Sequence, residues 1–288
     1  MSEKFLWGQM TWQEIRQAAE QERVALLPVG VIEQHGYHLP TQVDTFLADR
    51  ICSLAAEQMP DRAIVVPPVV HGYVPHHMDF PGTITVRGQV FIDYVVDVCK
   101  SIASHGFQKL LILNGHGGNT SVLDLAAKIT TLDTGAFCAF ISHWELEPVK
   151  RAMSELRESP PAGGTLHADE YETSVYLAID EGGVQMDKAV REYEVPDSRY
   201  FWIDMFGGGD RITAARFIQP WSSFTESGVA GDPTVATKEK GERLVDAAIE
   251  GLVELVDEMR ARPIREAVDH HGRERSDVVD DDKRVGPW

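Results

Sequence analysis

The stretch VALLPVGVIEQHGYHLPTQVD, residues 24–44, joins an uninterrupted apolar run to a loop that is rich in histidines and carboxylates. An apolar run that ends at a glycine is typical of a strand buried on both faces of a parallel sheet. The loop after it carries four side chains that can bind a metal ion or a proton: Glu33, His35, His38 and Asp44. Ligands of open α/β sheets bind beyond the carboxyl ends of the strands. The stretch therefore predicts both the fold class and the edge of the sheet that carries the site.

Apolar runs and amphipathic segments alternate on both sides of this stretch. Strands are predicted at residues 24–30, 63–70, 109–114 and 136–142. Helices are predicted at residues 11–21, 45–59, 89–104, 120–131 and 237–260, and another begins within HADEYETS, residues 167–174. The prolines of the second strand place it near an edge or end it early. The alternation predicts an α/β fold with a mostly parallel sheet covered by helices on both faces.

No linker or composition break divides the chain before residue 263. We therefore predict one domain over residues 1–262, in which residues 187–233 form loops and cover, followed by a charged tail at 263–288. Few large apolar residues occur in that tail, which predicts that it is mobile or held against a partner.

Composition and charge exclude several classes of protein. The 288 residues include 27 basic and 45 acidic side chains, so the formal charge is −18. A nucleic-acid binder needs concentrated basic charge, and an anionic membrane surface would repel this chain. The sequence has neither a signal-peptide core nor an apolar run long enough to span a membrane, so we expect a cytoplasmic protein. Its three cysteines are far apart and lie among apolar residues, which predicts reduced core thiols.

Three further segments bring histidines to strand ends or helix starts. NGHGGNT, residues 114–120, follows a strand and holds His116 in a glycine-rich turn, which lacks the lysine of a nucleotide-binding loop. HADEYETS offers His167, Glu170 and Glu172, although the helix dipole alone favours acidic residues there. HGYVPHHMDFPGTIT, residues 71–85, supplies further polar side chains that we expect to face substrate or support the site: His71, His76, His77 and Asp79.

Each segment alone also fits a polar loop or a helix cap. Four segments that deliver histidine with carboxylate to one crevice together favour a metal hydrolase, because such donors suit zinc, manganese or iron.

The motifs PVGVIEQHGYHLPTQVD, FPGTIT, NGHGGN, HADEYETS and GVAGDPTVAT resemble those of the creatininase (creatinine amidohydrolase) family. The resemblance implies a single three-layer α/β/α domain, two divalent metal ions and assembly as a homo-oligomer, commonly a hexamer. It implies that Glu33 and His116 bind one metal, that His35 binds the other, and that Asp44 bridges both.

Two departures from the family pattern point away from creatinine as the substrate. Gly117 and Gly118 stand where creatinine-cleaving members have a tyrosine and a glutamate ligand, and the resemblance implies that Glu172 replaces that ligand. Gly163 stands in place of a tryptophan lid residue, while Trp144 matches a second substrate-facing tryptophan. Relatives of this type include formamide hydrolases, a peptide-processing peptidase and hydrolases that open oxidised inositol rings.

The resulting hypothesis is a hydrolase that uses two divalent ions, zinc first and manganese or iron as alternatives, to activate water against a carbonyl. His167 would shuttle a proton, because imidazole titrates near neutral pH, and Glu172 would act as a ligand or base. Residues predicted to contact a small-molecule substrate are Tyr73, His77, Trp144, Gly117 and Gly118, with Phe80 and Trp202 as further wall residues. The first substrate class is a small cyclic amide. The alternatives are a cyclic ketone opened by carbon–carbon hydrolysis, a formamide, and a non-enzymatic protein stabilised by metal.

Overall fold

A parallel four-stranded sheet forms the centre of the part of the chain that the structure describes, namely residues 4–193, 198–207, 215–265, 268 and 270 of a computed structural model. Its strands are β1 (Val24–Val29), β2 (Ala63–Val65), β3 (Lys109–Asn114) and β4 (Phe137–Ser142), in the order β2-β1-β3-β4. The strand order reverses direction between β1 and β3, so the connections that follow these two strands leave toward opposite faces of the sheet. Open α/β sheets bind ligands beyond the carboxyl ends of the strands at such a reversal.

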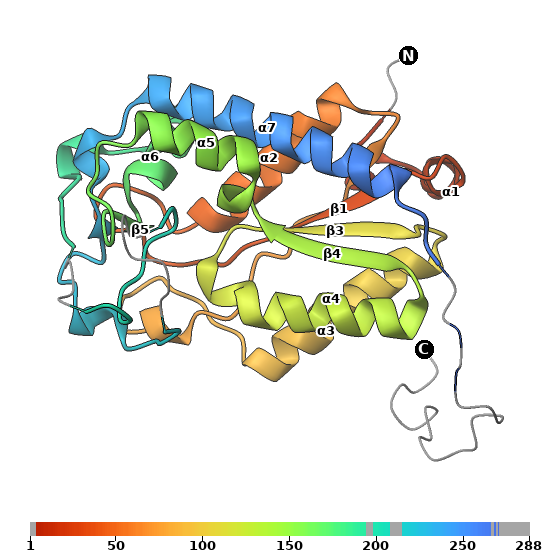
Figure 1. The fold of residues 1–288 in the computed structure, drawn as a ribbon, viewed down its shortest axis with the longest axis horizontal. Coiled ribbons are helices and arrows are strands. Elements are labelled where there is room, and N and C mark those ends of the chain that lie inside the picture. Colours follow the sequence, from red (N-terminus) through yellow and green to blue (C-terminus); the bar gives the residue numbers. More distant parts are fainter. Residues whose placement is uncertain (1–3, 194–197, 208–214, 266–267, 269, 271–288) are drawn as a thin grey trace.

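Helices cover both faces of the sheet and give three layers (Figure 1). One layer contains α2 (Val43–Gln58), α5 (Glu147–Leu156), α6 (Glu170–Ile179) and α7 (Lys238–Ala261). The other contains α3 (Gly88–Ser104) and α4 (Thr120–Thr134), and α1 (Trp12–Glu20) packs on the same core. The predicted α/β fold with a mostly parallel, doubly covered sheet is confirmed.

Side-chain alternation along the strands creates two separate cores. On β1, Val24 and Leu26 belong to the core shared with α2 and α7, whereas Ala25, Leu27 and Val29 belong to the core under α3 and α4. Successive residues of a strand point to opposite faces. A continuous apolar run is therefore what a strand needs when helices cover it on both sides.

The predicted element bounds agree with the structure except in a few places. β2 is an edge strand that stops before Pro67, as its prolines predicted. Helix α5 was not predicted. Nor was the short antiparallel pair of β5 (Thr165–His167) and β6 (Ala230–Gly231), which lies partly within the region expected to be loop.

Short 3₁₀ turns complete the described elements, and among those that lie at the site are η2 (Pro75–His77), η3 (Gly117–Asn119) and η7 (Trp221–Ser223). Most of the predicted tail, including its aspartate cluster at 277 and 280–282, lies outside the described residues. Among the described helices, none combines the length and the apolar composition that crossing a membrane requires.

Close backbone contact at two glycines places the start of α2 directly on the strand ends. A Cβ atom on Gly115, just after β3, would lie 2.1 Å from the carbonyl oxygen of Asp44. A Cβ atom on Gly30, just after β1, would lie 2.4 Å from the amide nitrogen of Thr45. Only glycine permits this approach, so the two strand ends fix the position of Asp44.

Candidate metal centre

Seven buried side chains meet at the carboxyl edge of the sheet, where β1 and β3 end. They come from the loop after β1, the first turn of α2, the loop after β2, the loop after β3, and the β5–α6 segment. They are Glu33, His35, Asp44, His77, His116, His167 and Glu172. The crevice predicted from the strand ends is therefore the place where the histidines and carboxylates gather.

Glu33 lies at the centre of this cluster and faces three imidazoles. Its Oε1 atom is 2.9 Å from Nδ1 of His77 and 3.1 Å from Nδ1 of His167, and its Oε2 atom is 2.9 Å from Nδ1 of His116. Despite these short distances, neither oxygen accepts a hydrogen bond of normal geometry from any residue that the structure describes. A fully buried carboxylate without hydrogen bonds is costly unless a cation compensates it.

His35 presents a lone pair to two carboxylates. Its Nδ1 atom lies 3.0 Å from the carbonyl oxygen of Glu33, which can only accept, so Nδ1 carries the hydrogen. In the neutral ring Nε2 is then unprotonated, and it lies 3.0 Å from Oδ1 of Asp44 and 3.7 Å from Oε2 of Glu172. Metal-binding histidines characteristically donate their second nitrogen to such a carbonyl. Only a proton or a metal ion between these atoms relieves their repulsion.

Asp44 lies between two histidines and uses a different oxygen toward each. Oδ1 faces His35, while Oδ2 lies 3.1 Å from Nδ1 of His116. Each oxygen of this carboxylate therefore faces a different imidazole, and the bridging role that the family resemblance implies for Asp44 stays a prediction.

The titration behaviour of the cluster shows an excess of negative charge. Burial alone would lower the pKa of His35, but the carboxylate of Asp44, followed by Glu172, outweighs burial and raises that pKa to about 10. Burial opposes protonation of His116 too, and Glu33 with Asp44 raises its pKa to about 10. Burial would raise the pKa of Glu33, yet the facing histidines hold it well below 4.5. The pocket therefore favours cations strongly.

Three overlapping triads of ligand atoms lie within 4.8 Å of one another: Glu33, His77 and His167; His35, His167 and Glu172; and Glu33, His35 and Asp44. Mixed imidazole and carboxylate donors suit zinc, manganese or iron. The residues present therefore fit divalent metal ions in number, chemistry and orientation.

His77 and His167 both face the Glu33 carboxylate inside the cluster, whereas the sequence predicted a substrate contact for His77 and proton transfer for His167. His77 was expected to face substrate, and its ring instead contacts Glu33 directly. The Nε2 atom of His167 donates to the carbonyl oxygen of Gln34 at 2.7 Å. Burial, followed by the charge of His35, lowers the pKa of His167 well below 6.5. Its role as a proton shuttle stays a prediction.

The start of α6 separates a structural glutamate from one that faces the cluster. Asp169 caps the helix by accepting from the amide of Glu172 at 3.0 Å, and Oε2 of Glu172 accepts from the amide of Ala168 at 2.6 Å. Glu170 instead pairs with Lys240 at 2.6 Å. Burial raises the pKa of Glu172 well above 4.5. The ionised form of this carboxylate is therefore unfavourable unless a cation compensates its charge.

Several predicted substrate residues lie away from these atoms. Tyr73 packs on the core under α3, and Trp144 is buried in the opposite core, with its ring centroid 4.9 Å from that of His143. Their substrate roles stay predictions without a contact to support them. Phe80 is half-buried, His71 is exposed, and Asp79 accepts from Ser222 at 2.5 Å.

Gly118 lies against the cluster, whereas Gly117 is exposed at its edge. A Cβ atom on Gly118 would come within 2.5 Å of Nε2 of His116 and 2.9 Å of Cε1 of His76. The absence of a side chain at Gly118 therefore leaves the space that His116 and the half-buried His76 occupy, and the substrate contact predicted for this glycine stays a prediction.

The sequence reasoning missed three residues of the site. Gln34 donates to the carbonyl oxygen of Gly228 at 3.0 Å, and its Nε2 atom lies 3.1 Å from a ring nitrogen of both His77 and His167. The position of Gln34 between Glu33 and His35 in the sequence could have indicated that it lies in the site. His143 follows β4 as His116 follows β3, and its Nδ1 is 2.7 Å from the hydroxyl of Tyr171. Trp221 stacks on His77, and no motif marked it.

Replacing Gly115 by alanine is expected to weaken zinc binding at least about tenfold, because the new Cβ atom must displace Asp44 and metal sites are sensitive to ligand position. Isothermal titration of the metal-free protein with zinc measures this. The control is Gly182→Ala, since a Cβ atom there meets its nearest neighbour at an ordinary 3.6 Å. Equal zinc affinity for Gly115→Ala and wild type would show that the glycine contact does not position Asp44.

Comparison with known proteins agrees with the fold and the site. The family model described as creatinine amidohydrolase matches residues 8–256. The chain is 28% identical to the creatinine amidohydrolase of Pseudomonas putida, over 90% of this chain and 98% of that protein. It is 30% identical to the 3-dehydro-scyllo-inosose hydrolase of Thermotoga maritima, over 88% of this chain and 83% of that protein.

Solved creatininase structures show the same fold. One described as a manganese form has a TM-score of 0.75, covering 90% of this chain and all of the other at 24% identity. A mutant of Zn-Zn type has a TM-score of 0.74, covering 91% of this chain and all of the other at 24% identity. The chain belongs to the creatininase family of hydrolases.

Proposed function

We propose that this protein is a hydrolase that depends on two divalent metal ions, with zinc as the first candidate, and that it cleaves a small cyclic amide other than creatinine. The observation that carries the proposal is the position of Asp44 between His35 and His116, next to a Glu33 carboxylate that lacks hydrogen bonds. The Zn-Zn and manganese forms of solved creatininases support the choice of metals.

Each ligand has a defined place in this proposal. Glu33 and His116 would hold one ion, His35 and Glu172 would hold the other, and Asp44, which faces both His35 and His116, would serve both. Ions bound there supply Lewis-acid polarisation of a carbonyl and lower the pKa of water. Four to five ligands are too few to saturate two ions, which favours catalysis over a purely structural site.

Proton movement falls to His167. Because Nε2 is committed to the carbonyl of Gln34, Nδ1 is the atom that can take up a proton, and the low pKa keeps it unprotonated at neutral pH. Its depth in the cluster keeps bulk water away from this atom. We assign to the amide of Gly118, whose backbone lies against the His116 ring, the stabilisation of an oxygen that gains negative charge.

A cyclic ketone is the second candidate substrate, since the inosose hydrolase is similar in sequence to this chain. Hydration of an amide carbonyl and of a ketone both begin with addition of water, so one ligand set serves either reaction. Glycines at 117 and 118, in place of the tyrosine and glutamate expected of creatinine-cleaving members, speak against creatinine itself.

The test is a substrate panel on zinc-loaded and manganese-loaded protein that contains creatinine, other lactams, N-substituted formamides and keto-inositols. We expect turnover of a lactam or formamide and none of creatinine. Turnover confined to the ketones would replace the amide by the carbon–carbon hydrolase, and no turnover of any compound with either metal would contradict the proposal.

We further propose a homo-oligomer, with the hexamer as the expected form, located in the cytoplasm. Light scattering coupled to size-exclusion chromatography is expected to give six chains of 32.0 kDa each.

A further inference from the structure

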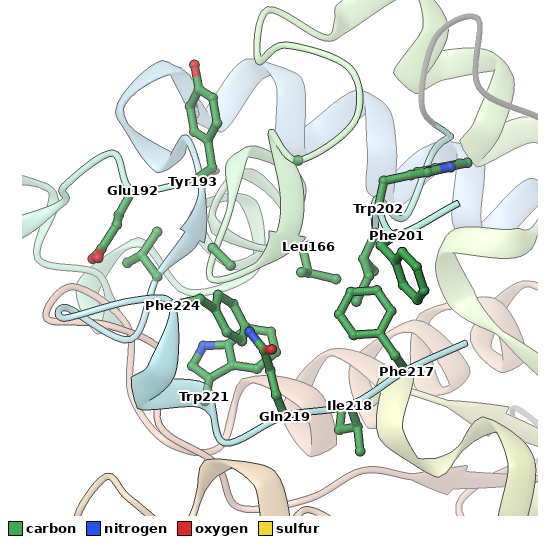
Figure 2. A pocket seen from close by; sticks show the side chains of 14 residues that line it. Leu166, Glu192, Tyr193, Phe201, Trp202, Phe217, Ile218, Gln219, Trp221 and Phe224 are labelled. Atoms are coloured by element: carbon green, nitrogen blue, oxygen red, sulfur yellow. The ribbon is translucent and has the colours of Figure 1, made fainter. Parts of the chain in front are cut away.

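A cavity of about 250 Å³ lies near the metal centre, and its wall is mostly apolar (Figure 2). Leu166 lies in the middle of the view, between the rings of Trp221 and Phe224 and those of Phe201 and Phe217. We call it the aromatic cavity.

Trp221 is the wall that the aromatic cavity shares with the metal centre. Its ring stacks on His77 with centroids 4.1 Å apart, and it meets His167 edge-on at 5.2 Å. Its Nε1 atom donates to the carbonyl of Gly228 at 2.8 Å, the same carbonyl that accepts from Gln34. A group bound in the cavity therefore lies one side chain away from the cluster.

Strand β5 also lies between the aromatic cavity and the metal centre. Leu166 lines the cavity, whereas its neighbour His167 belongs to the metal centre. Successive side chains of a strand point to opposite sides. One strand thus positions a wall of the aromatic cavity and a residue of the cluster together.

The volume and the wall chemistry define what fits. An engineered cavity of about 150 Å³ holds benzene, and drug-sized ligands need roughly 300–1,000 Å³, so the aromatic cavity suits a group of one or two rings. Aromatic walls favour a planar apolar group. The Glu192 carboxylate, which also lines the cavity, already accepts hydrogen bonds from the amides of Glu226 at 2.6 Å and Ser227 at 2.9 Å. The cavity therefore does not select a cation.

We propose that the aromatic cavity binds a planar apolar substituent of the substrate while the reacting carbonyl lies at the metal centre. The inference rests on the proposed hydrolase function and narrows its substrates to carbonyl compounds that carry a ring larger than creatinine's methyl group. Trp221, through its contacts with His77 and His167, fixes the distance between the two parts of the substrate.

The experiment has a binding arm and a turnover arm, both with zinc-loaded protein. Indole is the binding probe, followed by saturation-transfer NMR. Leu166→Phe fills the cavity and Phe217→Ala removes part of its wall, and each is expected to weaken indole binding roughly 10-fold. Tyr94→Ala, an exposed aromatic residue on α3, is the matched control and is expected to bind indole as the wild type does.

In the turnover arm, benzyl- and methyl-substituted members of the carbonyl class identified by the substrate panel are compared. The benzyl compound is expected to have a kcat/KM roughly 10- to 100-fold higher, and Leu166→Phe is expected to reduce that ratio toward one. Turnover without this preference, or indole binding that Leu166→Phe leaves unchanged, would overturn the inference alone.

Indole binding without turnover of any panel compound would instead overturn the proposed function on which the inference rests. A change of oligomer size in Phe217→Ala would show that a second copy of the chain covers the cavity, which would also overturn the inference.

Discussion

Replacing Glu33 by glutamine is expected to lower kcat/KM and zinc affinity by at least about 100-fold. Losing a residue that only orients a metal ligand typically lowers metal affinity or activity about 10- to 100-fold, and Glu33 faces the ring nitrogens of three histidines directly. The substitution keeps the shape of the side chain but removes its charge. An amide nitrogen would then face one of the imidazoles that now lie 2.9 to 3.1 Å from the carboxylate.

The matched control is Glu170→Gln, which alters a glutamate that is also buried but pairs with Lys240. It is expected to lower the melting temperature without changing zinc affinity, because Glu170 does not face the cluster. Zinc content by mass spectrometry, kinetics and thermal unfolding of both variants measure the contrast. If Glu33→Gln kept its zinc and its activity, Glu33 would not be a ligand.

Removing the metal ions is expected to lower the melting temperature by about 10 °C. A ligand present at 1,000 times its dissociation constant stabilises the folded state by about 4 kcal/mol, and in chains of this size 1 kcal/mol is worth about 2–4 °C. The cause is the cluster of buried carboxylates, which the metal-free protein compensates only by protonating histidines.

The same protons make the stability of the metal-free protein depend on pH. The pKa values of His35 and His116 rise from 6.5 to about 10 on folding, so the folded chain holds protons that the unfolded chain releases in this range. Stability from these two groups is complete below pH 6.5 and is lost as the pH rises through 10.

In the metal-loaded protein the ions replace these protons, so this decline is expected to disappear. Thermal unfolding from pH 6 to 10, with zinc and with a chelator, measures the difference. Parallel curves under the two conditions would show that the metal does not occupy the cluster.

The strands and the main residues of the cluster could be predicted from sequence because they follow from local rules. An apolar run such as residues 24–29 is needed wherever helices cover both faces, and parallel strands carry the residues after them to one edge. Glu33 and His116 follow β1 and β3, which are adjacent strands, so their convergence was predictable.

The parts that could not be predicted depend on long-range packing. His77 reaches Glu33 only because the loop after β2 crosses back over the strand ends. Tyr73 and Trp144 are aromatic residues of the kind that line pockets, but Trp144 is buried in one core and the half-buried Tyr73 packs against the other. Trp221 stacks on His77, which is 144 positions away in the sequence. The periodicity of apolar residues shows only which nearby residues share a face, so it cannot predict such a contact. Helix α5 begins with Glu147 and Pro148, so its start lacks the hydroxyl or aspartate cap that marks α1 and α6.

A zinc titration of the metal-free protein tests the central claim most directly, with bound zinc and hydrolysis of the best panel substrate measured in the same samples. We expect two zinc ions per chain, with hydrolysis absent in chelator and complete when both have bound. Asp44→Asn is expected to lose both properties, because this carboxylate faces His35 and His116. Full hydrolysis by the chelator-treated protein, with no zinc bound, would contradict the claim that these buried residues form a catalytic metal centre.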